Sequence, residues 1–318
     1  MATRETVGLI PTADHDAWDA FAREAGTIFH SAWWHRAWGA SVAVYARTDD
    51  DGIITAGLAL HVERYLGTRA VRRPPLTPLN GPLIGEPPAS NRSGRHSWTK
   101  KQTNAIMEAV PRLGLYDFVV RPGTTDALPF LWNGYRSGVT HTYVLSYGER
   151  DQWRDNMSEM NRRNLSKARR EADEADLSVE TDAGVSEIAE LLKDTARAKG
   201  FSFQRAAARL GSWWDEVRRR EAGRLYAVRD GDGAPCAATV MVWDARTAYY
   251  LAGGMRDGTR RSSRLNLLLF ERMIADANEM GLDFDFEGSS LPGVERFFRG
   301  WGGQLLQGTR FVKIPSFH

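Results

Sequence analysis

The sequence predicts an α/β protein made of two copies of one folding unit, each a mixed central sheet flanked by helices. Two observations lead to this prediction. The chain has 318 residues, which is long for one hydrophobic core and comfortable for two domains of about 150 residues each. Its second half also repeats most of the order of helices and strands expected in its first half. The expected domains are residues 1–148 and 149–318, and the C-terminal strand is a candidate to pack back on the first domain.

In the first half, apolar residues at helical spacing predict a helix from His15 to Ala25, and Ser31 begins a second helix rich in tryptophan. Four prolines between Arg72 and Pro82 exclude a regular helix and predict a rigid loop. The other expected elements are strands at Val42–Ala46, Ile53–His61, Leu115–Val120 and Tyr143–Ser146, and a helix at Ser97–Leu113.

The second half has a clearer pattern. Cys236–Trp243 is apolar at every position but one, which predicts a central strand covered on both faces. Arg264–Met280 has the spacing of an amphipathic helix, and Gly281 ends it. The remaining expected elements are helices in Glu149–Asp176, Val185–Lys199 and Gln204–Glu221, and strands at Arg224–Arg229, Thr247–Gly253, Gln304–Leu306 and Arg310–Ile314.

The stretch from Phe284 to Gly303 contains the strongest candidates for functional residues. A short strand places Phe284 and Phe286 on one side and Asp285 and Glu287 on the other, before a Gly-Ser-Ser turn and a helix. That helix carries its charged residues on exposed turns. Two interpretations remain open: a binding cleft with carboxylates at the end of a strand, or an edge strand with a solvated acidic face.

Composition excludes several classes of protein. The 42 Lys and Arg residues nearly balance 40 Asp and Glu residues, for a formal net charge of +2, so any basic site must be local. The only cysteine, Cys236, excludes an internal disulfide and a cysteine metal site. The first residues lack the apolar core of a leader, and no segment approaches the length of a membrane span. We expect a cytoplasmic monomer without a metal.

One local basic site does stand out. Residues 162–170 hold five cations and no acid, and Arg163, Lys167 and Arg170 share one helical face. This stripe could meet phosphates. It could equally be a solvated helix, because acidic residues follow it immediately.

Several motifs in this order resemble the Fem-like branch of tandem GNAT acyltransferases. The matching segments are Phe29–Trp34, Pro75–Pro82, Asn161–Ala168, Tyr249–Gly254 and Phe284–Gly303. The resemblance spans nearly the whole chain. It implies transfer of an aminoacyl group from aminoacyl-tRNA, used as co-substrate with no other cofactor, to an amine of a peptidoglycan precursor or of a small molecule such as an antibiotic.

Two other functions stay open: an acyl-CoA-dependent N-acyltransferase, and a non-catalytic tandem GNAT protein that binds RNA or a partner. A CoA-dependent GNAT domain carries glycines in the loop before the helix, where backbone amides hold the pyrophosphate. The corresponding stretch, Gly258–Asn266, has arginines but lacks glycines where close backbone approach would need them. This pattern favours tRNA as the donor.

The resemblance also assigns candidate residues. Phe298 occupies the position where the family usually carries lysine, and the next residue, Arg299, could replace that charge only if it reached the same space. A shift of one residue turns a helical side chain by about 100°. The expected catalytic residues are Asp285, Glu287, Arg299 and Tyr250; the expected substrate-binding residues are Trp34, Asn80, Gly288, Ser289 and Phe298; and the expected tRNA-binding residues are Arg162, Arg163, Lys167, Arg170, Arg260, Arg261 and Arg264.

Overall fold

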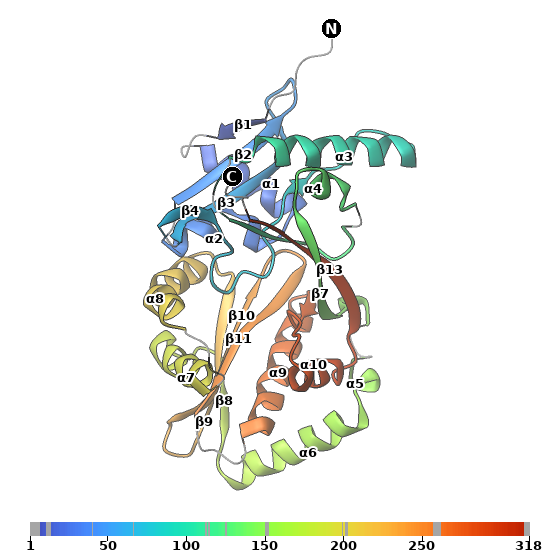
Figure 1. Cartoon of the computed structure of the whole chain (residues 1–318). Coiled ribbons are helices and arrows are strands. Elements are labelled where there is room, and N and C mark those ends of the chain that lie inside the picture. Colours follow the sequence, from blue (N-terminus) through green and yellow to red (C-terminus); the bar gives the residue numbers. More distant parts are fainter. Residues whose placement is uncertain are drawn as a thin grey trace. The chain divides into compact units, whose positions relative to one another are not determined.

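The chain folds into two compact units (Figure 1). Unit 1 contains the described residues up to Thr140 and those from Gln307 onward, and unit 2 runs from His141 to Leu306. The computed structural model describes residues 7–10, 14–39, 41–65, 67–111, 113, 115–124, 126–149, 153–198, 200, 203–256 and 262–314.

Unit 1 is a mixed sheet with strand order β1-β2-β3-β4-β6-β13, and β5 pairs with β3 beside this path. Its strands are β1 (Val7–Ile10), β2 (Ser41–Thr48), β3 (Ile54–Tyr65), β4 (Thr68–Val71), β5 (Leu83–Ile84), β6 (Tyr116–Val120) and the end of β13 (Gln304–Lys313). Its helices are α1 (His15–Ala25), the 3-10 turn η2 (Ile28–His30), α2 (Ala32–Ala37), α3 (Arg92–Ala109) and α4 (Leu128–Trp132).

Strand β3 shows why helices cover both faces of this sheet. Leu58 and Leu60 share one hydrophobic cluster with Ile106 of α3, whereas Ala59 belongs to another cluster with Trp18 of α1. Successive residues of a strand point to opposite faces. The sheet of unit 1 therefore lies between α3 on one face and α1 on the other.

Unit 2 has the strand order β7-β12-β11-β10-β9-β8. These strands are β7 (Arg136–Leu145), β8 (Ser178–Glu180), β9 (Gly223–Arg229), β10 (Pro235–Trp243), β11 (Thr247–Met255) and β12 (Asp283–Asp285). The helices are η3 (Tyr147–Glu149), α5 (Trp153–Asn156), α6 (Glu159–Glu174), α7 (Val185–Ala198), α8 (Gln204–Arg219), α9 (Ser262–Glu279) and α10 (Pro292–Arg299).

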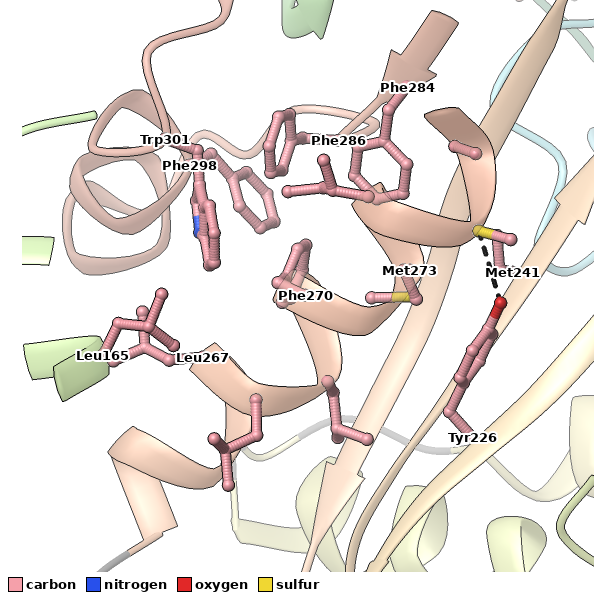
Figure 2. Close-up of a cluster of buried hydrophobic side chains, with 14 of the residues drawn as sticks. Leu165, Tyr226, Met241, Leu267, Phe270, Met273, Phe284, Phe286, Phe298 and Trp301 are labelled. Atoms are coloured by element: carbon pink, nitrogen blue, oxygen red, sulfur yellow. Dashed lines mark hydrogen bonds between the residues drawn. The ribbon is translucent and has the colours of Figure 1, made fainter. Parts of the chain in front are cut away.

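The core of unit 2 confirms the predicted central strand. The seven residues from Cys236 to Val242 are all buried, because β9 and β11 flank β10 and helices cover both faces of the sheet (Figure 1). On the α9 face, aromatic side chains from α9, α10 and the β12 region pack together around Phe270 (Figure 2). Phe284 and Phe286 lie inside this cluster, as the alternation of their strand predicts.

The two units repeat one order of elements. Along the chain, α3 is followed by β6, α4 and β7, and α9 is followed in the same way by β12, α10 and β13. Three details of the prediction were wrong. Strands β1, β4, β5 and β8 and helix α4 were missed, the strand near Tyr143 begins earlier, at Arg136, and the two expected final strands form one strand, β13.

Helices long and apolar enough to cross a bilayer are absent from the described part of the chain.

Candidate active site

The most distinctive feature of unit 2 is the place where two parallel strands part. Strands β11 and β12 pair from Thr247 and Asp283 as far as Tyr249 and Asp285. Beyond that pair β12 ends, whereas β11 continues, with Leu251 as an extra residue in its ladder with β10. Bulges of this kind redirect a strand and are common beside active sites. We call this point the fork, and it places Tyr250 and Asp285 next to the separation.

Asp285 is held at the fork by two donors. The Thr142 hydroxyl and the Glu287 backbone N–H both donate to its Oδ1 atom, the latter at 2.8 Å. Burial raises the pKa of Asp285 to about 6 from its ordinary 3.8, and the two hydrogen bonds oppose this rise only in part. A carboxylate whose pKa approaches neutrality suits general-base catalysis. Asp285 therefore has the environment expected of a catalytic base.

The turn after Asp285 has an unusual backbone. Glu287 and Gly288 have φ angles of 60° and 58°, in the left-handed region. A Cβ atom at residue 288 would overlap the carbonyl oxygen of His141, so this position requires glycine. The Ser289 hydroxyl accepts a hydrogen bond from the Leu291 N–H at 3.1 Å. Gly288 and Ser289 thus shape the turn, and their contact with substrate stays a prediction.

The strained backbone of Glu287 permits a test of its side chain. Glu287→Gly should raise the free energy of unfolding by up to about 1 kcal/mol, because glycine adopts a left-handed conformation without a steric cost. Glu287→Gln should leave stability nearly unchanged. If the carboxylate binds or deprotonates the acceptor amine, both variants lose turnover. Chemical denaturation and an acyl-transfer assay measure the two effects, and full turnover in both folded variants would contradict the catalytic role.

Tyr250 and Phe298 face the interior of unit 2. The centroids of their rings lie 5.8 Å apart, and both rings contact Phe270, with Phe298 shown in the aromatic cluster of Figure 2. Burial raises the pKa of Tyr250 to about 12, so its hydroxyl stays protonated and can donate. Phe298 is only 3% exposed. Phe298 therefore packs in the core of unit 2, and its contact with substrate stays a prediction.

Arg299 does not occupy the space of Phe298. Its guanidinium pairs with Glu295 one turn earlier on α10, at 2.9 Å, and 60% of its side chain is exposed. Glu295 also accepts a hydrogen bond of 2.7 Å from the Tyr143 hydroxyl. The pKa of Glu295 is lowered, first by Tyr143 and then by Arg299. Arg299 thus belongs to a chain of polar groups that runs from the buried Tyr143 through Glu295 to the surface, and its catalytic role stays a prediction.

The residues that hydrogen-bond to Asp285 and Glu295 could not be predicted from any local sequence pattern. Thr142 and Tyr143 lie on β7, more than 140 positions before the groups that they contact. Only the folding of β7 beside β12 brings them there, through the pairs Phe284–Leu145 and Asp285–Val144. Both residues join the candidate site.

The basic stripe lies on the exposed side of α6. Asn161, Leu165, Ala168 and Ala172 form the buried side of this helix. Arg162, Arg163, Lys167 and Arg170 are exposed, and Arg163 pairs with Glu159. Arg264 pairs with Glu171 across α6 and α9 instead of extending the stripe. The predicted Arg260 and Arg261 lie outside the described residues.

Two predicted substrate-binding residues lie in unit 1, and both are buried there. The Trp34 indole donates to the Thr77 hydroxyl at 2.8 Å and has no exposed surface. The Asn80 side chain bridges two backbone groups of β6, the Asp117 carbonyl and the Val119 N–H, each at 2.8 Å. Trp34 and Asn80 therefore hold the proline-rich loop, and a contact with substrate stays a prediction for both.

Among the described residues of the two units, no group of three or more His, Cys, Asp or Glu side chains is arranged so that it could hold a metal ion.

Part of the sequence matches a known domain family, and the fold matches several solved structures. Residues 160–299, which include α6, the fork and α10, match the acetyltransferase (GNAT) domain family. No curated protein matches the sequence.

Solved structures share the fold over nearly the whole chain. FemX has a TM-score of 0.65 and 14% identity, with 97% of both chains covered. The L-PGS of Bacillus licheniformis has a TM-score of 0.56 and 12% identity, covering 95% of this chain and 92% of its own. A tandem GNAT protein from the clavulanic acid biosynthesis pathway has a TM-score of 0.54 and 12% identity, covering 98% and 99%. The predicted Fem-like tandem GNAT fold is confirmed.

Proposed function

We propose that this protein is an aminoacyl-tRNA-dependent aminoacyltransferase, which forms an amide bond on an amine acceptor. The exposed basic face of α6 favours a tRNA donor over a small one. Among the described residues, the ion pairs of the α6 cations involve Arg163 and Arg169, and none involves Arg162, Lys167 or Arg170. Such a face suits the closely spaced phosphates of an RNA stem. The Fem-like fold supports the same donor.

The residues at the fork can carry the chemistry of this transfer. The neutral amine attacks the ester carbonyl carbon, and the carbon–nitrogen bond forms as Asp285 accepts the amine proton. Tyr250 stays a predicted donor to the negative oxygen of the tetrahedral intermediate, because its ring packs on the α9 face of the sheet while Asp285 points to the opposite face. The carbon–oxygen ester bond then breaks, and the ribose oxygen of the tRNA leaves as a hydroxyl with the proton that Asp285 had accepted, which returns Asp285 to its ionised form. No covalent bond to the protein is needed.

A direct test uses bulk tRNA charged with labelled amino acids. The protein, the charged tRNA and a cell extract that supplies amine acceptors are combined, and the label is followed from tRNA into an amide that resists mild alkali. Transfer above the rate of ester hydrolysis is the expected result. Tight binding of tRNA without transfer to any acceptor would instead indicate a non-catalytic RNA-binding protein.

The α6 face gives a quantitative prediction. Replacing Arg162, Lys167 and Arg170 together by glutamine should lower the affinity for tRNA and reduce the slope of log K against log salt by about 2, because each lost phosphate contact removes about 0.7–0.9. Filter binding at several salt concentrations measures this slope. The matched control replaces three exposed arginines of α8, Arg205, Arg209 and Arg218. If both triple variants lose tRNA affinity equally, the net charge of the protein, and not the position of these residues on α6, determines the binding of tRNA.

An acyl-CoA-dependent N-acyltransferase is the second candidate. The matched family is described as an acetyltransferase domain, and the structure of the clavulanic acid pathway protein is described with reference to AcCoA. Calorimetric titration with acetyl-CoA separates the two candidates. We expect no binding heat, whereas stoichiometric binding would favour the CoA-dependent function.

A further inference from the structure

Unit 1 closes its own counterpart of the fork with the proline-rich loop. Strands β4 and β6 run parallel but share only the pair Val71–Tyr116. Past this pair, the N–H groups of Asn80 and Gly81 both donate to the Val119 carbonyl at 3.0 Å. A Cβ atom on Gly81 would lie 2.6 Å from a methyl group of Val120, so glycine permits this close approach. The loop therefore replaces β4 beside β6, and the chain then continues through Pro82 into β5, which pairs with β3.

A cavity of about 430 Å³ lies beyond this closure, wholly within unit 1. This volume is within the range of small-molecule sites. Leu83, Val120 and Phe130 contribute apolar wall, while His30, Lys100 and Arg121 contribute nitrogen donors. The cavity is thus apolar on part of its wall and rich in donors on another part.

His30 is a buried donor at this cavity with a defined orientation. Its side chain is only 3% exposed, and its Nδ1 atom accepts the Thr27 backbone N–H at 3.2 Å. The neutral ring must then carry its proton on Nε2. Burial, with a smaller contribution from Arg121, lowers the pKa of His30 to about 3, so the ring stays neutral at physiological pH. Among the described residues, no hydrogen-bond acceptor contacts Nε2–H.

The charges around the cavity leave an excess of positive charge. Lys100 lies 3.3 Å from Asp126, which also lies 3.4 Å from His96, so Lys100 is largely balanced. Arg121 donates one N–H to the Ala25 carbonyl at 3.3 Å and forms no ion pair with a described residue. Its remaining guanidinium donors are available to an anion. Arginine binds carboxylate and phosphate well because its donors match two oxygens at once.

We propose that this cavity is a binding site for a small organic anion. Arg121 and the Nε2–H of His30 hold its carboxylate or phosphate group, Lys100 supports them, and the apolar body of the ligand packs against Leu83 and Phe130. The site lies in unit 1 and is independent of the transfer proposed for unit 2.

Three probes of similar size test this site on the full-length protein: benzoate, phenyl phosphate and benzyl alcohol. Binding is measured by calorimetry and by the ¹H–¹⁵N signal of the His30 ring, which a bound anion should shift. We expect at least one anion to bind and the neutral alcohol not to bind. The anion that binds more tightly shows whether the site prefers a carboxylate or a phosphate group. Equal binding of the alcohol, or binding of neither anion, would overturn the proposal.

Variants connect this binding to the residues. Arg121→Gln and Lys100→Gln should each lower the affinity for the preferred anion about tenfold, which is the usual effect of losing one charged hydrogen bond. His30→Asn keeps an acceptor for the Thr27 N–H and removes the distal donor, so it should also weaken binding. Lys101→Gln is the control, because Lys101 is the exposed neighbour of Lys100 on α3. Binding unchanged in Arg121→Gln and Lys100→Gln would refute the site even if His30→Asn failed to fold.

Discussion

Asp285→Asn should lower the rate of acyl transfer by about 10²–10⁴-fold while leaving the fold intact, because a general base contributes a factor of this size. The amide oxygen of asparagine can still accept hydrogen bonds from the Thr142 hydroxyl and the Glu287 N–H, which contact Oδ1 in the wild type. Only the proton-accepting ability is lost. The measurement is kcat/KM with whichever donor supports turnover.

The same residue predicts a pH profile. The wild-type kcat/KM should fall about tenfold per pH unit below pH 6, because Asp285 must be ionised to accept a proton and its pKa is about 6. The variant should lack this limb. Asp283→Asn is the control on the same strand: Asp283 accepts the Tyr147 N–H at 2.8 Å and is only the smallest cause of the raised Asp285 pKa, so this variant should keep the acidic limb, moved slightly to lower pH. A wild-type profile identical to that of Asp285→Asn would exclude Asp285 as the base.

The stability of Asp285→Asn should change in the opposite direction from its activity. The folded state raises the pKa of Asp285 above its ordinary value, so the wild type binds this proton more tightly when folded and loses stability as pH rises from about 4 to 6. Above pH 6 the full cost is present, at most about 3 kcal/mol. Asparagine has no such cost. The variant should therefore be more stable than the wild type at pH 8 and similar to it at pH 4.

Gly288→Ala should destabilise unit 2 by about 3 kcal/mol or more, since the added Cβ would overlap the His141 carbonyl at a left-handed backbone position. Either the turn or β7 must move, which would separate Thr142 from Asp285. Denaturant unfolding should show a lower midpoint, and transfer activity should fall with it.

Gly293→Ala provides the contrast. Gly293 lies in α10 without a positive φ, and a Cβ atom added there would have no neighbouring atom within 4 Å. Alanine should leave stability unchanged or raise it by about 0.5–1 kcal/mol. If Gly288→Ala and Gly293→Ala lose similar amounts of stability, the close approach of residue 288 to His141 is not the reason that glycine is required there.

Much of the fold follows from local sequence pattern. The helix His15–Ala25 has its predicted bounds, and the apolar run of β10 predicts its central place. Helix α4 was missed because it has only five residues, with a proline at its start and exposed leucines. Strand β13 was divided because Gly308 interrupts its pattern, yet that glycine lies against Thr140, where a Cβ would be crowded.

The candidate site was only partly predictable, for a different reason. The alternation Phe284-Asp285-Phe286 directs the carboxylate away from the core, and this follows from strand geometry alone. The pKa of Asp285 depends on burial and on Thr142, and no local pattern indicates a contact over 143 positions. Arg299 could not be placed from the sequence either, because its orientation depends on Glu295 and on the exposed side of α10.

The path of β13 has a consequence for synthesis on the ribosome. Its residues Thr309–Lys313 complete the sheet of unit 1 beside β6, and the ring of Phe311 stacks on that of Phe130 at 3.8 Å. The ion pair of Arg310 with Asp117 joins residues 193 positions apart. The nascent chain must therefore keep the edge of β6 uncovered while all of unit 2 is translated. Unit 2, which is continuous in sequence, can fold first, and the unit that begins the chain is the last to be finished.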